Sequence, residues 1–97
     1  MKSLVNNRLE LVTTNQFKKD LKRIQKRGYN IQKLHNILNT LRSNQTLAPN
    51  FRNHALTGNY IGFRECHIEP DWLLVYAINH GNLILVASRT GTHSDIF

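Results

Sequence analysis

The sequence has few of the features that mark secreted or membrane proteins. It contains one cysteine, Cys66, so an intramolecular disulfide is impossible and a structural zinc site lacks companion ligands. The longest apolar stretch, Trp72 to Ile78, has seven residues, whereas a membrane-spanning helix needs about 20. The first twelve residues hold no apolar run long enough for a signal peptide. We therefore expect a cytoplasmic protein that does not enter a membrane.

Acidic residues are also scarce. Six Asp and Glu oppose thirteen Lys and Arg, which gives a formal net charge of +7. Eleven of the basic side chains but only two of the acidic ones fall within residues 1–52. This charge attracts polyanions, of which nucleic acid is the commonest in a cell, although an acidic protein or an anionic membrane would be attracted too. The length of 97 residues suits one domain, so we predict a single domain over residues 1–97.

The first half of the chain predicts a strand followed by two helices. Leu9–Val12 is a short apolar stretch, and the apolar residues from 17 to 24 then recur at helical spacing, with Gly28 as the stop. A second helix starts after Asn30, a good N-cap, and ends near Ser43. The first helix carries six cations and no interleaved glutamate, which indicates a phosphate-binding surface. These cations are Lys18, Lys19, Lys22, Arg23, Lys26 and Arg27.

The second half predicts strands. Residues 45–58 resemble a connecting loop with a short strand at His54–Leu56, and Tyr60–Ile68 is rich in β-formers. Trp72–Ile78 and Leu83–Ser88 are continuous apolar strands, which a short link joins as an antiparallel hairpin. Because Trp72–Ile78 is apolar on both faces, we expect a central strand with the helices on one side. The order strand, helix, helix and three or four strands predicts an α+β domain.

Five histidines are the main source of chemistry. Histidine titrates near neutrality and can take or give a proton at working pH. Three of the five, His54, His67 and His93, stand near strand ends or loops, whereas His35 and His80 occupy ordinary surface positions. A metal site from the alternating His67, Glu69 and Asp71 is disfavoured because Pro70 interrupts the strand. We therefore expect neither a metal nor another cofactor, and we interpret Cys66 as a core residue.

The final segment, Arg89 to Phe97, concentrates potential phosphate donors. It holds an arginine, a glycine and two threonines, a set that suits a phosphate but is also compatible with a solvated polar tail. Two aromatic residues have a similar ambiguity. Phe97 and Trp72 could each pack in the core or stack on a nucleic-acid base.

Three blocks of this sequence resemble the YafQ group of the RelE/ParE toxin superfamily. They are Asn53-His54-Ala55-Leu56-Thr57-Gly58, Glu65-Cys66-His67-Ile68-Glu69-Pro70-Asp71-Trp72-Leu73-Leu74-Val75-Tyr76, and Arg89 to Phe97. Weaker similarity extends back through Phe17-Lys18-Lys19-Asp20-Leu21 and Lys26-Arg27-Gly28, which leaves about a dozen residues unmatched at the start.

The resemblance implies a ribosome-dependent endoribonuclease of a type II toxin–antitoxin pair. It implies a β-α-α-β-β-β chain in which two helices pack on a small, largely antiparallel sheet. A cognate antitoxin with an acidic segment, the ribosome and messenger RNA are the implied partners, and the antitoxin complex is expected to bind operator DNA. The implied catalytic residues are His54, His67, Asp71 and His93, with Arg89, Trp72 and Phe97 assisting.

Cleavage of RNA by acid–base chemistry needs a base, a phosphate-binding cation and an acid. Our hypothesis assigns the base to His54 or His67, the acid to His93 and the phosphate clamp to Arg89, with Asp71 orienting a histidine or holding a proton. The alternative is a non-catalytic module that binds nucleic acid or a protein, such as the gyrase-directed branch of the superfamily or a transcriptional co-repressor.

Overall fold

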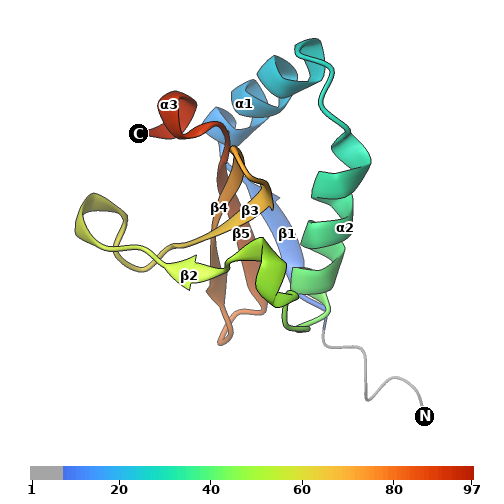
Figure 1. The fold of residues 1–97 in the computed structure, drawn as a ribbon. Helices are drawn as coiled ribbons and strands as arrows, with labels where there is room; N and C mark the ends of the chain where they lie inside the picture. Colours follow the sequence, from blue (N-terminus) through green and yellow to red (C-terminus); the bar gives the residue numbers. More distant parts are fainter. Residues whose placement is uncertain (1–7) are drawn as a thin grey trace.

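The computed structural model describes residues 8–97 (Figure 1). Residues 1–7, which include most of the segment where we expect no signal peptide, lie outside the described residues. The elements are β1 (Glu10–Thr13), α1 (Asn15–Lys26), α2 (Ile31–Arg42), η2 (Pro49–Phe51), β2 (His54–Ala55), η3 (Gly58–Tyr60), β3 (Arg64–Glu69), β4 (Trp72–Asn79), β5 (Ile84–Gly91) and α3 (His93–Ile96). Within residues 8–97, no helix combines the length and apolar character needed to cross a membrane.

All five strands form one sheet in the order β1-β5-β4-β3-β2. Three neighbouring pairs are antiparallel, and β1 alone runs parallel to its neighbour, β5. The predicted α+β class, the two helices and the central position of Trp72–Ile78 are confirmed. The parallel pairing of the first and last strands is a feature that the apolar pattern does not reveal, because pattern gives strand positions but not their neighbours.

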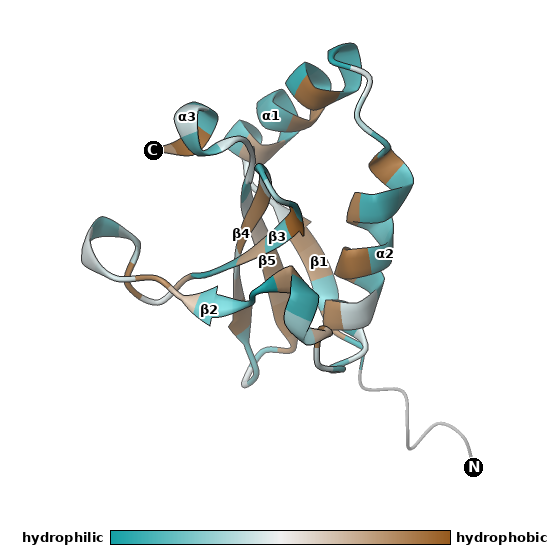
Figure 2. Ribbon diagram, viewed as in Figure 1, coloured by the Kyte–Doolittle hydropathy of each residue, from teal (hydrophilic) through white to brown (hydrophobic). Residues whose placement is uncertain are grey.

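Both long helices begin and end at residues suited to those positions. The Thr14 side chain accepts a hydrogen bond from the Phe17 amide and so caps α1, and Asn30 caps α2 in the same manner. Gly28 ends the first helix with a φ of 82°, a conformation that costs glycine little. The helices pack their apolar sides on one face of the sheet, as the brown stripes facing the strands in Figure 2 show.

The other face of the sheet has a smaller apolar cluster. Leu73 and Val75 point to this face because they alternate along β4 with residues that face the helices. Ile96 of α3 packs on them, and so do partly buried residues from the segment between β2 and β3. Helix α3 and that segment therefore lie on the side of the sheet that α1 and α2 leave open, which we call the open face.

Two predicted strand boundaries differ from the structure by more than one residue. Strand β3 begins at Arg64 rather than Tyr60, since Gly58 and Gly62 both have positive φ and the chain between them turns instead of extending. Strand β5 continues to Gly91, and the expected polar tail after it folds into α3. Thr92 and Asp95 form a capping box at the start of that helix.

Candidate active site

Two of the predicted catalytic histidines lie side by side on the open face of the sheet. His54 of β2 pairs in register with Glu65 of β3, and His67 follows Glu65 two residues later on the same face. Their ring centroids are 6.3 Å apart. The Nε2 atoms of His54 and His67 each lie 3.5 Å from Oε2 of Glu65, so both rings are within ion-pair distance of the same carboxylate.

The opposite nitrogen of each ring is held by the backbone. Nδ1 of His54 is 2.7 Å from the Arg52 carbonyl oxygen, and Nδ1 of His67 is 3.2 Å from the Pro70 carbonyl oxygen. A carbonyl oxygen only accepts, so Nδ1 carries the hydrogen in both rings. Nε2 is therefore the nitrogen of each histidine that is left to take up or release a proton.

Glu65 is a residue that the sequence analysis did not assign to the site. Its side chain is 5% exposed, and burial of a carboxylate is costly unless hydrogen-bond or charge partners surround it. The available signal was spacing, because a residue two positions before a strand histidine faces the same way. Only the β2–β3 register brings His54 to the same carboxylate.

The segment that carries His54 is anchored by Asn53. The buried Tyr76 hydroxyl donates to the Asn53 side-chain oxygen at 2.9 Å, and Nε of Arg64 donates to the same oxygen at 3.1 Å. Burial raises the pKa of the Tyr76 phenol, which therefore remains a donor at neutral pH. These two bonds attach the short edge strand β2 to the body of the sheet.

His93, the third predicted catalytic histidine, is the first residue of α3. Its backbone amide donates to Oδ1 of Asp71 at 3.4 Å, which connects α3 to the turn between β3 and β4. Its ring lies 5.5 Å from that of Phe97, and Phe97 in turn contacts Tyr60 with ring centroids 5.2 Å apart. Because Phe97 is still 54% exposed, a face of this ring remains accessible to a base.

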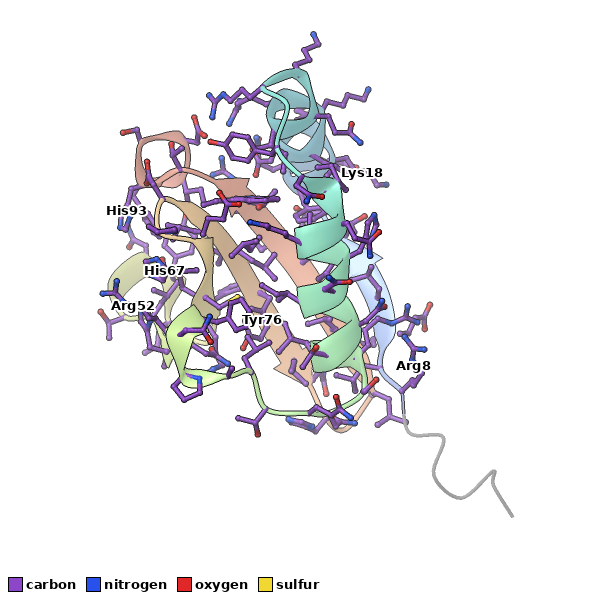
Figure 3. All side chains as sticks on the ribbon, turned by 45° about the vertical axis from the view of Figure 1, so that its right-hand side comes forward. Arg8, Lys18, Arg52, His67, Tyr76 and His93 are labelled. Atoms are coloured by element: carbon purple, nitrogen blue, oxygen red, sulfur yellow. The ribbon has the colours of Figure 1, made fainter. Side chains whose placement is uncertain are left out.

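Figure 3 shows His93 and His67 on the same side of the molecule, with Arg52 below them and Lys18 away from them. A cavity of about 370 Å³ opens beside His67, and exposed Arg52 is the cation in its lining. The lining residues are Asn50, Phe51, Arg52, His67, Ile68, Glu69 and Pro70. Arg52, like Glu65, belongs to this site by position and was not identified from the sequence.

Arg89 occupies a different environment from the one expected. Its Nε and Nη2 donate to the two carboxylate oxygens of buried Asp20 at 2.8 and 3.3 Å, and Nη2 also donates to the Asp95 carbonyl oxygen at 3.1 Å. The hydrogen bonds to Asp20 raise the pKa of the guanidinium. Arg89 thus cross-links α1, β5 and α3, and the phosphate-clamp role assigned to it from the sequence stays a prediction.

The threonines of the final segment also form hydrogen bonds within the protein. The Thr90 hydroxyl donates to the Leu73 carbonyl at 2.8 Å and accepts from Trp72 Nε1 at 2.9 Å, while Thr92 caps α3. The Thr90 hydroxyl therefore both donates and accepts inside the protein, and the Thr92 oxygen accepts the bond that caps α3.

Trp72 is a core residue. Its side chain is 1% exposed and its ring contacts Tyr29 edge to face, with centroids 4.9 Å apart. A base has no access to this ring, so the expected role in substrate binding is corrected to core packing. The two interpretations that the sequence left open for Trp72 are separated by the strand register, which turns this side chain toward the helices.

The basic helix α1 contains two classes of cation. Arg27 forms a bidentate pair with Asp95, and Arg23 lies 3.5 Å from Asp20 and 3.7 Å from Asp95. These two arginines are thus paired within the protein, and their expected substrate-binding role stays a prediction. The other four cations are exposed and form no ion pair within residues 8–97. They are Lys18, Lys19, Lys22 and Lys26.

The alternative metal site does not assemble. Glu69 pairs with Lys33 of α2 at 2.6 Å, whereas His67 lies against Glu65, so His67, Glu69 and Asp71 do not converge. A register shift between His67 and Glu69 separates them. Cys66 is fully buried, and burial raises its pKa to about 12, so the thiol is a poor nucleophile, as its interpretation as a core residue implies.

Comparison with known proteins gives concordant results. A family model described as the bacterial toxin of a type II toxin–antitoxin system, YafQ, matches residues 9–97. The match starts earlier than the resemblance seen in the motifs, since it includes β1. The mRNA interferase toxin YafQ of Escherichia coli K12 is 37% identical over 83 residues, which cover 84% of this chain and 88% of that protein.

Solved structures agree in fold and sequence. A metal-bound toxin from Helicobacter pylori has a TM-score of 0.87 and 40% identity, covering 92% of this chain and 99% of that one. The toxin in the E. coli DinJ-YafQ complex has a TM-score of 0.83 and 34% identity, covering 92% and 98% respectively. Both structures therefore share the fold of this chain over 92% of its length.

Proposed function

Since the chain belongs to the YafQ family of type II toxins, we propose that it is an endoribonuclease that cleaves messenger RNA by acid–base catalysis. The observation that carries this proposal is the cluster of His54, His67 and Glu65 on the open face of the sheet, with His93 on the same side. Imidazoles supply both acid and base at neutral pH, so the proposed reaction needs no metal.

The first half of the reaction is removal of a proton from the 2′-hydroxyl. Nε2 of His67 or His54 is the base, because Nδ1 of each ring is already bonded to a carbonyl. Both Nε2 atoms lie 3.5 Å from Oε2 of Glu65, and this buried carboxylate stabilises the positive charge of whichever ring takes up the proton. The 2′-oxygen then attacks the adjacent phosphorus.

The second half is departure of the 5′-oxygen. The P–O5′ bond breaks as His93 protonates the leaving oxygen, and the products are a 2′,3′-cyclic phosphate and a 5′-hydroxyl. Asp71, whose carboxylate accepts from the His93 amide, keeps the start of α3 near this site. Arg52 is the proposed cation for the phosphate, since it is exposed beside His67, and Phe97 offers an accessible ring for stacking.

The proposed partners follow from the family and the charge. The solved E. coli relative is complexed with DinJ, and we propose that this chain too is neutralised by a cognate antitoxin, whose acidic segment is attracted by the +7 charge. The ribosome is proposed as the place of cleavage, where the lysines of α1 contact ribosomal RNA, and the antitoxin complex is proposed to bind operator DNA.

Induction of the chain alone, followed by mapping of the 5′ ends of cellular messages, tests the proposal. We expect new 5′-hydroxyl ends within coding regions, which disappear when the antitoxin is co-expressed. Purified ribosomes programmed with a message, compared with the same message free in solution, test ribosome dependence. Growth arrest with intact messages would instead identify a non-catalytic or gyrase-directed toxin.

Ribosome binding is expected to weaken steeply with added salt. Each lysine of the set Lys18, Lys19, Lys22 and Lys26 that contacts a phosphate contributes about 0.7 to 0.9 to the slope of log K against log salt. Replacing all four by glutamine should therefore flatten the slope by up to about 3.6, measured by binding to purified ribosomes at several salt concentrations. The matched variant with four arginines should keep the slope. If the glutamine variant has the same slope as the wild type, these lysines do not contact the phosphates of ribosomal RNA.

A further inference from the structure

The helix that carries His93 cannot support itself. Helix α3 spans four residues, His93–Ile96, and isolated helices shorter than about 12 residues are marginal in water. Its apolar support is small, because Ile96 is its one residue in the cluster on the open face of the sheet. The position of the proposed general acid therefore depends on polar contacts.

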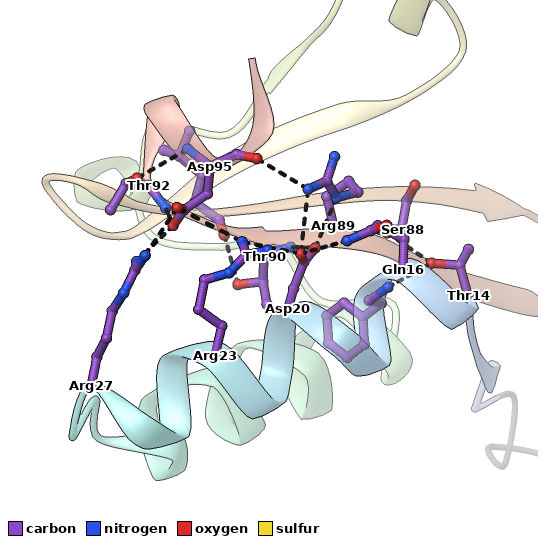
Figure 4. Close-up of polar contacts among 12 residues, drawn as sticks. Thr14, Gln16, Asp20, Arg23, Arg27, Ser88, Arg89, Thr90, Thr92 and Asp95 are labelled. Carbon is purple, nitrogen blue, oxygen red and sulfur yellow. Dashed lines mark hydrogen bonds and ion pairs between the residues drawn. The ribbon is translucent and has the colours of Figure 1, made fainter.

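Asp95 provides the main polar contact between α3 and α1. Nη1 of Arg27 donates to its Oδ2 at 2.7 Å and Nη2 donates to its Oδ1 at 3.1 Å, a bidentate geometry (Figure 4). Arg23 approaches the same carboxylate at 3.7 Å. These hydrogen bonds hold the pKa of Asp95 well below its usual range, so the carboxylate is charged throughout the neutral range.

The same carboxylate also fixes the chain just before the helix. Oδ2 of Asp95 accepts from the Thr92 amide at 2.9 Å, and Thr92 Oγ1 accepts from the Asp95 amide at 3.2 Å. A Cβ on Gly91 would lie 2.8 Å from that Oδ2. The glycine thus makes room for the carboxylate, and its φ of 145° is one that residues with side chains rarely adopt.

A second connection runs in parallel through Asp20. This fully buried carboxylate of α1 accepts from Arg89, and Arg89 donates to the Asp95 backbone carbonyl. Figure 4 shows both routes from α1 to α3, one through Arg27 and one through Arg89. The side chain and the backbone of Asp95 are therefore each bound to an arginine.

We infer that Asp95 is a positioning residue, and that its pairing with Arg27 and Arg23 holds the proposed general acid His93 beside Asp71 and Phe97. This inference rests on the proposed function. Arg27, which its place on a basic helix had suggested as an RNA contact, has both terminal nitrogens engaged by Asp95 and contributes through the position of His93.

A double-mutant cycle tests the inference. Asp95→Asn keeps an oxygen to cap Thr92 but loses the charge, and Arg27→Gln loses the partner. Each should lower kcat about 10- to 100-fold with little change in KM, because a displacement of about 1 Å from the reacting geometry has effects of that size. The double variant should be no slower than either single one, since both remove the same interaction.

A readout independent of activity accompanies the kinetics. The Phe97 amide donates to the His93 carbonyl oxygen at 2.8 Å. The hydrogen-exchange rate of this amide therefore measures how often α3 unfolds locally. Its hydrogen exchange should accelerate about tenfold in Asp95→Asn and in Arg27→Gln. Arg27→Lys, which keeps the charge without the bidentate geometry, should fall between wild type and Arg27→Gln. Arg8→Gln removes one cation far from α3 and should change neither kcat nor exchange.

The outcomes separate the possibilities. A raised KM in Arg27→Gln with kcat unchanged, or losses that multiply in the double variant, would mean that Arg27 binds RNA directly and would overturn the inference. Unchanged exchange and kcat in Asp95→Asn would overturn it as well. If the wild-type chain cleaves no message, the proposed function fails, and the exchange data alone then decide whether Asp95 holds α3.

Discussion

His93→Ala should reduce mRNA cleavage by about 10² to 10⁴, the range that general acid–base groups contribute. The loss arises because the 5′-oxygen then leaves without a proton donor. Folding should be nearly unaffected, since His93 is exposed and exposed substitutions usually change stability by less than about 0.5 kcal/mol. Single-turnover cleavage of a ribosome-bound message, together with thermal unfolding, measures both quantities.

A matched control is available in the chain. His35 is exposed on α2 and stands outside the proposed site, so His35→Ala should cleave at the wild-type rate. His67→Ala and Glu65→Gln extend the comparison to the proposed base and its carboxylate. Wild-type rates in both His93→Ala and His67→Ala would show that the mechanism is wrong, whatever the fold.

Trp72→Ala should lower the free energy of unfolding by about 3 to 5 kcal/mol, the usual cost of truncating a buried aromatic residue. The ring is almost wholly buried against Tyr29, and its Nε1 donates to Thr90. A domain of this size should lose more than about 10 °C in Tm. Chemical and thermal denaturation of the purified variant measure the change.

Phe97→Ala is the paired comparison, since it removes the exposed aromatic ring of the same chain. It should cost less than about 1 kcal/mol in stability and yet weaken cleavage, because its accessible face is the one proposed to stack on a base. Trp72→Phe retains a packed ring and should keep near-wild-type activity. Loss of RNA binding in a stable Trp72→Phe would restore the base-stacking interpretation.

The sequence predicts much of the fold because its signals are local. The spacing of Phe17 and Ile24, the caps Thr14 and Asn30 and the glycine stop define helices with little reference to the rest of the chain. The C-terminal helix was missed although its capping box is visible as Thr92 and Asp95. A four-residue helix has no periodicity to detect, and its stability comes from contacts that are distant in sequence.

The part of the site that local sequence signals define could also be predicted. Histidines near strand ends can be selected by residue type, but Glu65 gains its place only from the pairing of β2 with β3. Charge counting similarly could not distinguish Arg27 from Lys26. Both are basic residues of the last helical turn, and the difference between them is that Asp95, 68 residues further on, reaches one of them.

The parallel pairing of β1 with β5 affects when the chain can fold during its synthesis. Glu10 pairs with Ile84, 74 residues later, so the first strand emerges from a ribosome long before its partner exists. Contacts so distant in sequence form late and slow folding. The strand that completes the sheet also leads directly into α3. The sheet and the helix that carries His93 therefore cannot form until residues 84–97 have been made, so the proposed site is assembled late in synthesis.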